Sequence, residues 1–187
     1  SSDLLKDGKA TEKTYQEEYK LVGYFGRINY NYQGKYYLSA SIRHEGSSKF
    51  GADHKWGTFP AVSIGWNLKE ESFLKNVNFL SFLKLRAGYG ITGTIPGNPY
   101  LSLNTLDLGG YGYYGGQWTT LLRASSNPNP DLRWEKKKET NIGLDFAFFN
   151  DRISGSIDWY NRDTDDLIWD YTVSVPPYVK NTITANA

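Results

Sequence analysis

The chain has 187 residues and a net charge of +1, with 21 Lys and Arg against 20 Asp and Glu. This balance excludes a bulk electrostatic role such as coating nucleic acid, and the absence of cysteine excludes disulfides and thiolate metal sites. Aromatic residues make up 16% of the chain and glycine contributes 19 residues, a mixture typical of β structure with aromatic-lined ends.

Alternation of apolar and polar residues predicts long β-strands from residue 19 onward, after a polar stretch over residues 1–18 that is predicted as loop. The clearest case is residues 83–91, where Leu, Leu, Ala, Tyr and Ile alternate with Lys, Arg, Gly and Gly. Successive strand side chains leave on opposite faces, so one face is apolar and the other polar. The predicted strands cover residues 19–32, 36–45, 57–68, 81–92, 134–149 and 152–162.

The connections between these strands alternate between long and short. Residues 33–35 and 150–151 are predicted as tight turns, and residues 69–79 contain the run EESFLK, which is compatible with a single helical turn. The other connections are long, and residues 93–133 show no steady period and hold many glycines and prolines. Sorting short turns to one end and long loops to the other is typical of outer-membrane barrels.

The fold class predicted is therefore all-β, an antiparallel up-and-down meander of about six long strands that forms part of a larger transmembrane β-barrel, because a closed barrel needs about eight strands or more. No run of about 18 apolar residues occurs. Aromatic residues crowd the tight turns, as in the girdles at a membrane boundary. The residues predicted to face lipid include Val22, Ile42, Val62, Leu85, Leu144 and Ile157.

Two other classes of protein are compatible with parts of the pattern. A soluble carbohydrate-binding β-sandwich would show the same alternation, with its apolar faces packed about 10 Å apart against a second sheet. An enzyme would need a nucleophile and a base on one face, and the sequence offers no persuasive pair. We therefore expect no enzymatic activity and retain the binding module as the alternative.

The glycine-rich connection holds the best candidate for ligand binding. Tyr100, Tyr111, Tyr113, Tyr114 and Trp118 offer flat apolar faces with polar tips, on which sugar rings can stack. The competing interpretation is that these aromatics pack against neighbouring parts of the protein or against a partner. A second set of side chains is predicted to face the barrel lumen and to pair mostly with one another: Arg27, Arg43, Lys84, Arg86, Glu139, Asp145 and Asp158.

No cofactor or metal site is predicted. His44 and His54 are ten residues apart and lack a carboxylate at zinc-site spacing. Asp163, Asp165 and Asp166 lack the later Gly and Glu of a calcium loop, although calcium at the outer loops stays open.

Four ordered segments resemble the barrel of SusC/RagA-like TonB-dependent transporters. They are RHEGSSKFG at residues 43–51 with KWGTFPAVSIGW at 55–66, LSFLKLRAGYGITG at 80–93, NPDLRWE at 129–135, and NIGLDF at 141–146 with IDWYN at 157–161. The resemblance covers most of residues 19–169. His44 and Glu45 stand where that family more often has Arg or Ala and Asp, a mild departure.

The resemblance implies a barrel of about 22 strands in the outer membrane of a Gram-negative cell, with a plug domain inside the lumen. It implies import of bulky nutrients, more often glycans than peptides, together with a SusD-like surface lipoprotein that acts as a lid and with energy supplied through TonB. The partners expected are therefore that lipoprotein, TonB, the lipid bilayer and a glycan or peptide ligand, with no nucleic acid. Neither the plug nor a TonB-binding segment is expected within these residues.

Overall fold

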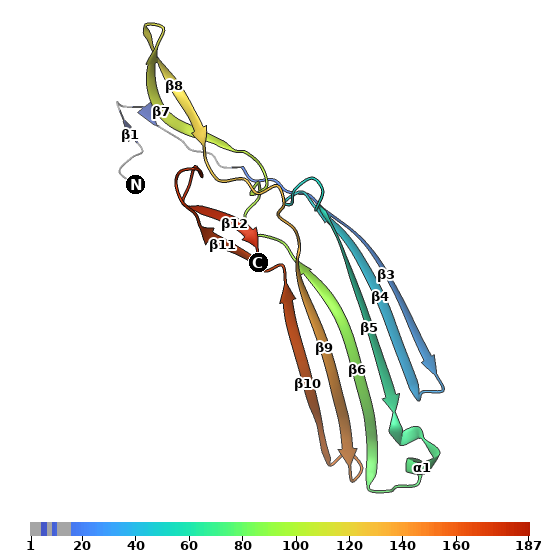
Figure 1. Ribbon diagram of the computed structural model, residues 1–187. Coiled ribbons are helices and arrows are strands. Elements are labelled where there is room, and N and C mark those ends of the chain that lie inside the picture. The colour runs from blue at the N-terminus through green and yellow to red at the C-terminus, as the bar shows by residue number, and fades with distance from the viewer. Residues whose placement is uncertain (1–4, 7–8, 11–15) are drawn as a thin grey trace.

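A single antiparallel sheet of six long strands dominates the chain. The computed structural model describes the backbone of residues 5–6 and 9–10, and residues 16–187 in full. The order of the strands across the sheet is β10-β9-β6-β5-β4-β3, so the predicted meander is confirmed (Figure 1). The strands are β3 (Leu21–Tyr32), β4 (Tyr36–Ser47), β5 (Trp56–Asn67), β6 (Leu80–Thr94), β9 (Glu135–Phe148) and β10 (Ile153–Asp165).

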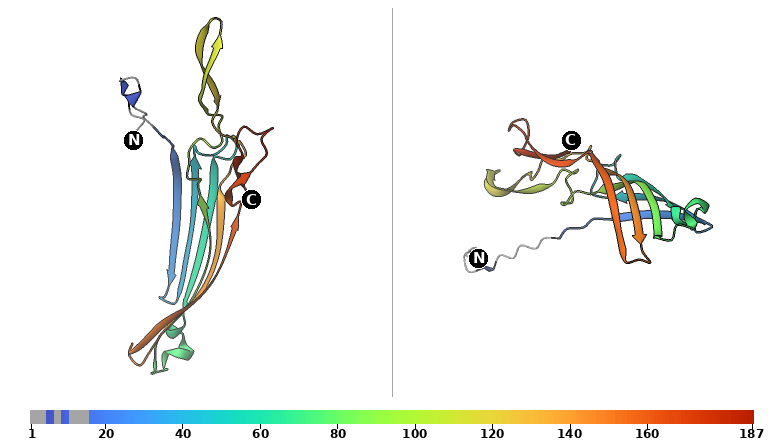
Figure 2. Two further views of the ribbon diagram at one scale, coloured as in Figure 1. Left: turned by 90° about the vertical axis from the view of Figure 1, so that its left-hand side faces the viewer. Right: turned by 90° about the horizontal axis from the view of Figure 1, so that it is seen from below.

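The sheet is one curved layer, shaped like a section of a cylinder wall (Figure 2). Large apolar side chains remain exposed along it, such as Ile28 at 73%, Ile64 at 58% and Ile157 at 65%. Among the residues that the structure describes, the remaining sheets each have two strands, and none of them packs face to face on this one (Figures 1 and 2). The arrangement does not support the sandwich alternative, which requires a second sheet over the apolar face.

The strand register places the alternating residues in matching rows. One row, which crosses all six strands, contains Tyr30, Leu38, Ile64, Ala87, Ile142 and Trp159. The row beside it contains Asn29, Ser39, Ser63, Gly88, Asn141 and Tyr160. Directly opposite residues in a sheet share a face. The sheet therefore has an apolar face and a polar face along its whole width.

Aromatic rings mark both ends of the apolar face. Near the short turns, the ring of Tyr36 stacks between Tyr32 and Trp66, with centroid distances of 6.4 and 6.2 Å. At the other end, Trp56 stacks on His44 at 4.8 Å and on Tyr24 at 6.2 Å. The two groups lie about 26 Å apart along β4, at a rise of about 3.3 Å per residue. With the strand tilt of about 35–45° found in outer-membrane barrels, this separation spans about 20 Å of membrane thickness, close to the apolar band of about 25 Å between their aromatic girdles.

The connections are sorted by length between the two ends of the sheet (Figure 1). At the short-turn end, the β3–β4 turn has both Gln33 and Gly34 at positive φ, which suits a tight hairpin turn. The β5–β6 connection at this end contains a 3₁₀ turn (Leu68–Glu70) and α1 (Ser72–Lys75), as the sequence predicted. The Lys69 ammonium caps α1 by donating to the carbonyls of Leu74, Lys75 and Val77. No helix in the described part of the chain is long and apolar enough to cross a membrane.

The connection over residues 93–133 was predicted to be irregular, and this is wrong. It contains a β-hairpin, β7 (Leu106–Tyr114) and β8 (Gln117–Ala124), that extends beyond the long-loop end of the sheet (Figure 1). A register shift between Leu108 and Gly110 inserts an extra residue, which interrupts the alternation in β7. Gly115 and Gly116, both at positive φ, form the turn, so this glycine pair was the signal for a hairpin.

The segment after residue 163, to which the sequence assigned no strand, contains a second short hairpin. β10 continues to Asp165, and β11 (Ile168–Thr172) pairs with β12 (Thr182–Asn186). Asparagine side chains attach this hairpin to residues 127–133. The buried amide of Asn127 donates to the carbonyls of Lys180 and Thr182, and its oxygen accepts from two backbone amides.

The loop predicted over residues 1–18 lies partly outside the described residues. Two short stretches in it, β1 (Leu5–Lys6) and β2 (Lys9–Ala10), pair antiparallel with each other. The prediction of loop is therefore wrong at these four positions.

A small buried core lies at the long-loop end. Phe50, Phe59, Leu132 and Trp134 are at most 5% exposed, and Ile91, Ile95, Leu101 and Ile168 pack against them. The Trp134 indole donates to the carbonyl of Lys55 at 3.0 Å. Gly51 lies so close to the Pro130 carbonyl that an added Cβ would be 1.6 Å from its oxygen. The four buried residues of this core come from the segments at residues 43–51, 55–66 and 129–135.

Candidate functional site: the polar face and the long hairpin

An ion-pair cluster spans three strands on the polar face. Arg86 on β6 donates from Nε and Nη2 to the two carboxylate oxygens of Asp145 on β9, at 2.7 and 2.8 Å. Its Nη2 also lies 3.0 Å from Asp158 Oδ1 on β10. The register places Gly143 between Arg86 and Asp158. Because Gly143 has no side chain, the guanidinium can cross β9 and reach both carboxylates.

We expect Gly143→Ala to weaken this cluster. A Cβ at residue 143 would lie 2.4 Å from Asp158 Oδ1 and 2.8 Å from Arg86 Nη2, so the ion pair with Asp158 must separate. Because these side chains are more than a third exposed, the loss in unfolding free energy should be only about 1 kcal/mol. Urea unfolding of the full-length protein measures it. Gly88→Ala is the control, because its nearest contact would be an ordinary 3.6 Å; an equal effect of both changes would contradict the prediction.

The other charged residues predicted for this face also have partners on it. Arg43 pairs with Glu45, and Arg162 with Glu139 at 2.6 Å. The Lys84 ammonium lies 4.4 Å from the centre of the Tyr37 ring. The Arg27 guanidinium lies 5.2 Å from the centre of the Phe25 ring, and no carboxylate among the described residues is within ion-pair distance of it.

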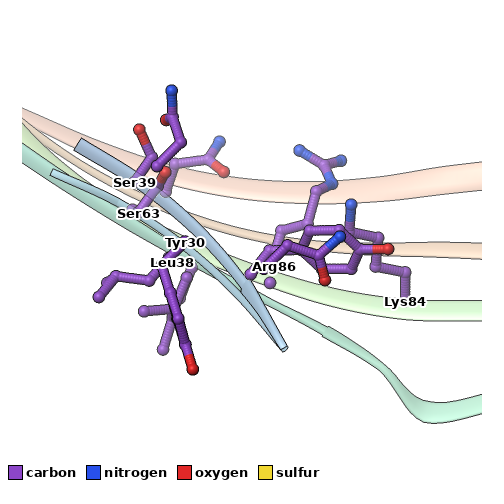
Figure 3. Close-up of a pocket in the computed structure, with 14 residues that line it drawn as sticks. Tyr30, Leu38, Ser39, Ser63, Lys84 and Arg86 are labelled. Atoms are coloured by element: carbon purple, nitrogen blue, oxygen red, sulfur yellow. The ribbon is translucent and has the colours of Figure 1, made fainter. Parts of the chain in front are cut away.

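A shallow groove of about 410 Å³ crosses the polar face (Figure 3). Figure 3 shows Ser39 and Ser63 extending to one side of the sheet and Tyr30 and Leu38 to the other. The polar residues that line the groove are Asn29, Asn31, Ser39, Ser63, Lys84, Arg86 and Asn141. Hydroxyl, amide and cationic groups thus converge there, and they can hydrogen-bond a polar ligand or another part of the protein.

The structure separates the aromatic residues that the sequence grouped together. Tyr111, Tyr113 and Trp118 share one face of the β7–β8 hairpin, where Tyr113 and Trp118 meet edge to face at 5.5 Å. Tyr114 lies on the other face of the hairpin. Tyr100 is outside the hairpin, and its hydroxyl accepts a hydrogen bond from the backbone amide of Glu18 at 3.0 Å.

Sequence reasoning missed the leucines beside these aromatics. The register places Leu106, Leu108 and Leu122 on the same face as Tyr111 and Trp118. All six large apolar side chains of this face, Tyr113 included, are 64–75% exposed. An isolated two-stranded hairpin is only marginally stable in water. The face therefore has the properties of a contact surface, and the turn signal at Gly115–Gly116 could have identified it.

The histidines and the acidic cluster have local partners. His44 Nδ1 lies 2.9 Å from Thr58 Oγ1, and the His54 amide donates to the Gly51 carbonyl. Asp165 pairs with Lys138, and Asp166 with Arg133 at 2.7 Å. Within the described part of the chain, no group of three or more His, Cys, Asp or Glu side chains is arranged to hold a metal ion.

A single-layer antiparallel wall, with one face apolar between two aromatic rows and the other polar, is the architecture of an outer-membrane-type β-barrel segment. A family model described as "TonB dependent receptor-like, beta-barrel" matches residues 3–187. The chain therefore belongs to the TonB-dependent receptor β-barrel family.

Within that family, the chain is SusC-like. It is 46% identical to TonB-dependent receptor SusC of Bacteroides thetaiotaomicron over 169 residues, which cover 87% of this chain and 17% of the relative. It is 38% identical to TonB-dependent receptor P39 of Formosa agariphila, over 89% of this chain and 15% of the relative. The chain thus spans less than a fifth of the length of these relatives.

The fold is similar to that of a solved transporter. The structure of the RagAB peptide importer in the closed-closed state matches with a TM-score of 0.86 and 27% identity, over 97% of this chain and 20% of that one. The open-open state of the same importer matches with a TM-score of 0.81 and 28% identity. The identification of a SusC/RagA-like barrel segment is confirmed.

Proposed function

We propose that this chain is part of the barrel wall of a TonB-dependent outer-membrane transporter that imports bulky nutrients, glycans rather than peptides. The observation that carries the proposal is the two-faced, single-layer wall with aromatic rows about 26 Å apart along β4. This spacing supports a wall with lipid against the apolar face and the polar face toward the lumen. The 46% identity to SusC supports the same role.

In this proposal the short-turn end lies in the periplasm and the long-loop end outside the cell, since outer-membrane barrels have short periplasmic turns and long extracellular loops. The lumenal side chains Arg27, Arg43, Lys84, Arg86, Glu139, Asp145 and Asp158 line the import path or the plug. TonB acts through parts of the protein outside this chain, and a SusD-like lipoprotein covers the extracellular opening.

The β7–β8 hairpin provides the contacts outside the membrane. Tyr111, Tyr113 and Trp118 near its tip offer flat faces on which sugar rings stack, which favours a glycan over a peptide. Leu106, Leu108 and Leu122 near its base are exposed branched aliphatic groups that fit a protein surface better than a sugar. We assign the tip to the ligand and the base to the lid lipoprotein.

We expect changes at the tip and the base of the hairpin to have separate effects. Replacing Tyr113 and Trp118 with alanine in the full-length protein should raise the Kd for its glycan by about threefold to tenfold, because the stacking faces are lost. Calorimetric titration with a panel of oligosaccharides and peptides measures this. Replacing Leu108 and Leu122 with serine should instead reduce recovery of the lipoprotein when the complex is purified.

Tyr114→Ala is the control for both changes, because Tyr114 is 85% exposed on the opposite face of the hairpin. Equal losses in all three variants would exclude the assignment of the tip and the base. Binding of peptides but not glycans would overturn the nutrient class, and recovery of the full-length protein outside the outer-membrane fraction would overturn the transporter assignment itself.

A further inference from the structure

A groove runs along the apolar face where β5 and β6 meet. It consists of two adjoining hollows, of about 410 and 280 Å³, which share Ile64 and Ala87. The first hollow extends toward Leu85 and Trp66 at the short-turn end, and the second toward Tyr89 and Val62. The two hollows together lead from the short-turn end toward the long-loop end of the apolar face. Strands of outer-membrane barrels are tilted by about 35–45° from the membrane normal, so a lipid acyl chain can lie in the groove at an angle to the strands.

The groove exists because a small residue interrupts a row of large ones. Ala87 lies between Ile64 and Ile142 in the cross-strand row, and between Leu85 and Tyr89 along β6 on the same face. Its methyl group leaves a notch that the four larger side chains surround. The lining of both hollows is almost entirely apolar and contains no charged side chain among the described residues.

A charged pair is fixed at the short-turn end of this groove. The Glu71 carboxylate, from the β5–β6 connection, accepts hydrogen bonds from the Tyr36 hydroxyl at 2.6 Å and the Trp66 indole at 3.0 Å. The Lys35 ammonium lies 3.3 Å from the other carboxylate oxygen. The bond from Tyr36, and after it the bond from Trp66, hold the pKa of Glu71 below its ordinary value. The aromatic row at the groove's end thus carries a positive and a negative charge side by side.

We propose that this groove binds one phospholipid with a zwitterionic amine headgroup, of the phosphatidylethanolamine type, from the periplasmic leaflet. The acyl chain lies in the Ala87 notch, continuous with the lipid face of the wall. The phosphate accepts from Lys35, and the lipid ammonium donates to Glu71, which has about one acceptor position beyond the three it uses here.

Charge complementarity selects this headgroup. The Lys35–Glu71 pair is neutral overall, as a phosphoethanolamine group is, so both of the headgroup's charges find a partner of opposite sign. An anionic phosphatidylglycerol headgroup would meet Lys35 but would bring its negative charge next to Glu71 without an ammonium to offset it. The inference rests on the membrane placement proposed above, and it adds a specific lipid ligand to it.

The test is lipid retention by the purified full-length protein, measured by native mass spectrometry. Equal amounts of phosphatidylethanolamine and phosphatidylglycerol with the same acyl chains are added in detergent. We expect the wild type to retain the ethanolamine lipid about tenfold better. Ala87→Leu should abolish this tightly held lipid by filling the notch, and the double change Lys35→Gln with Glu71→Gln should bring the preference close to unity.

Ala40→Leu is the matched control, since Ala40 lies on the apolar face of β4 in the row of Val62, outside the groove lining. Equal retention by Ala87→Leu and Ala40→Leu would overturn the groove assignment. A headgroup preference that survives the double change would overturn the role of Lys35 and Glu71. If the full-length protein is found in the outer membrane, either of these results overturns only the lipid-binding proposal and leaves the transporter proposal intact. If the protein is absent from the membrane fraction, the transporter proposal itself is overturned.

Discussion

Replacing Trp134 with alanine is expected to lower the unfolding free energy by about 3–5 kcal/mol, the range for removing a buried large aromatic side chain. Trp134 is 3% exposed and contacts Phe50 and Phe59, with ring centroids at 4.9 and 5.2 Å. The change also removes the hydrogen bond to the Lys55 carbonyl. Urea unfolding of the full-length protein in liposomes measures the loss of unfolding free energy. Hydrogen exchange at the backbone amides of Gly51 and Leu132 is measured as well.

The effect should be local to the long-loop end. The amide of Gly51 donates to the Leu132 carbonyl inside this core, so its exchange should accelerate strongly while that of central β4 amides changes little. Trp169→Ala is the matched control, because Trp169 is 64% exposed and stands outside the core. If the two substitutions are equally mild, then the buried cluster does not hold the loops together.

The long strands could be predicted from the sequence because each one has an apolar face and a polar face. In a single-layer wall, apolar and polar residues alternate regularly along each strand. The residue types at positions 83–91 and in the neighbouring strands therefore show directly which face each side chain is on. The tight turn was equally visible, since Gly34 suits the positive φ that a two-residue hairpin turn requires. Strand identity and the two faces therefore followed from local pattern alone.

The two outer hairpins could not be predicted in the same way. The extra residue between Leu108 and Gly110 shifts the alternation halfway along β7, so neither half shows a full strand period. β11 and β12 are five residues each, too short for alternation to stand out. Their position depends on Asn127, Asn129 and Asn186, whose hydrogen bonds join residues more than 50 apart in some cases.

The sequence showed which kinds of residues the candidate site contains, but not how they are arranged in space. Alternation indicated that the sheet has a polar face, yet nothing local indicated that Gly143 opens the path from Arg86 to Asp158. The aromatic residues of the long connection were noticed as a group, whereas the structure places Tyr100 apart and adds three leucines to the shared face. Which residues are neighbours across two strands depends on the strand register. The register cannot be read from the sequence where a bulge or a long loop intervenes.

Val62→Arg should be the most damaging single charge on the apolar face. Val62 lies in the row of Ala40 and Tyr89, near the middle of the distance between the aromatic rows of Trp56 and Trp66 on β5. An arginine facing lipid near the bilayer midplane costs about 2–4 kcal/mol. We expect the folded, heat-resistant fraction of the full-length protein in liposomes to fall accordingly in a urea titration.

Ser63→Arg is the control that separates the effect of the face of the sheet from the effect of the added charge. Ser63 is the next residue on β5, lies in the row of Ser39 and Gly88, and lines the polar groove. The same charge added there enters a polar environment and should leave stability nearly unchanged. The two positions are neighbours on the same strand, at nearly the same depth, and receive the same new side chain. They therefore differ only in the face of the sheet on which the arginine lies. A result in which Ser63→Arg is the more destabilising change would mean that the wall faces lipid with its polar side, and the transporter proposal would have to be withdrawn.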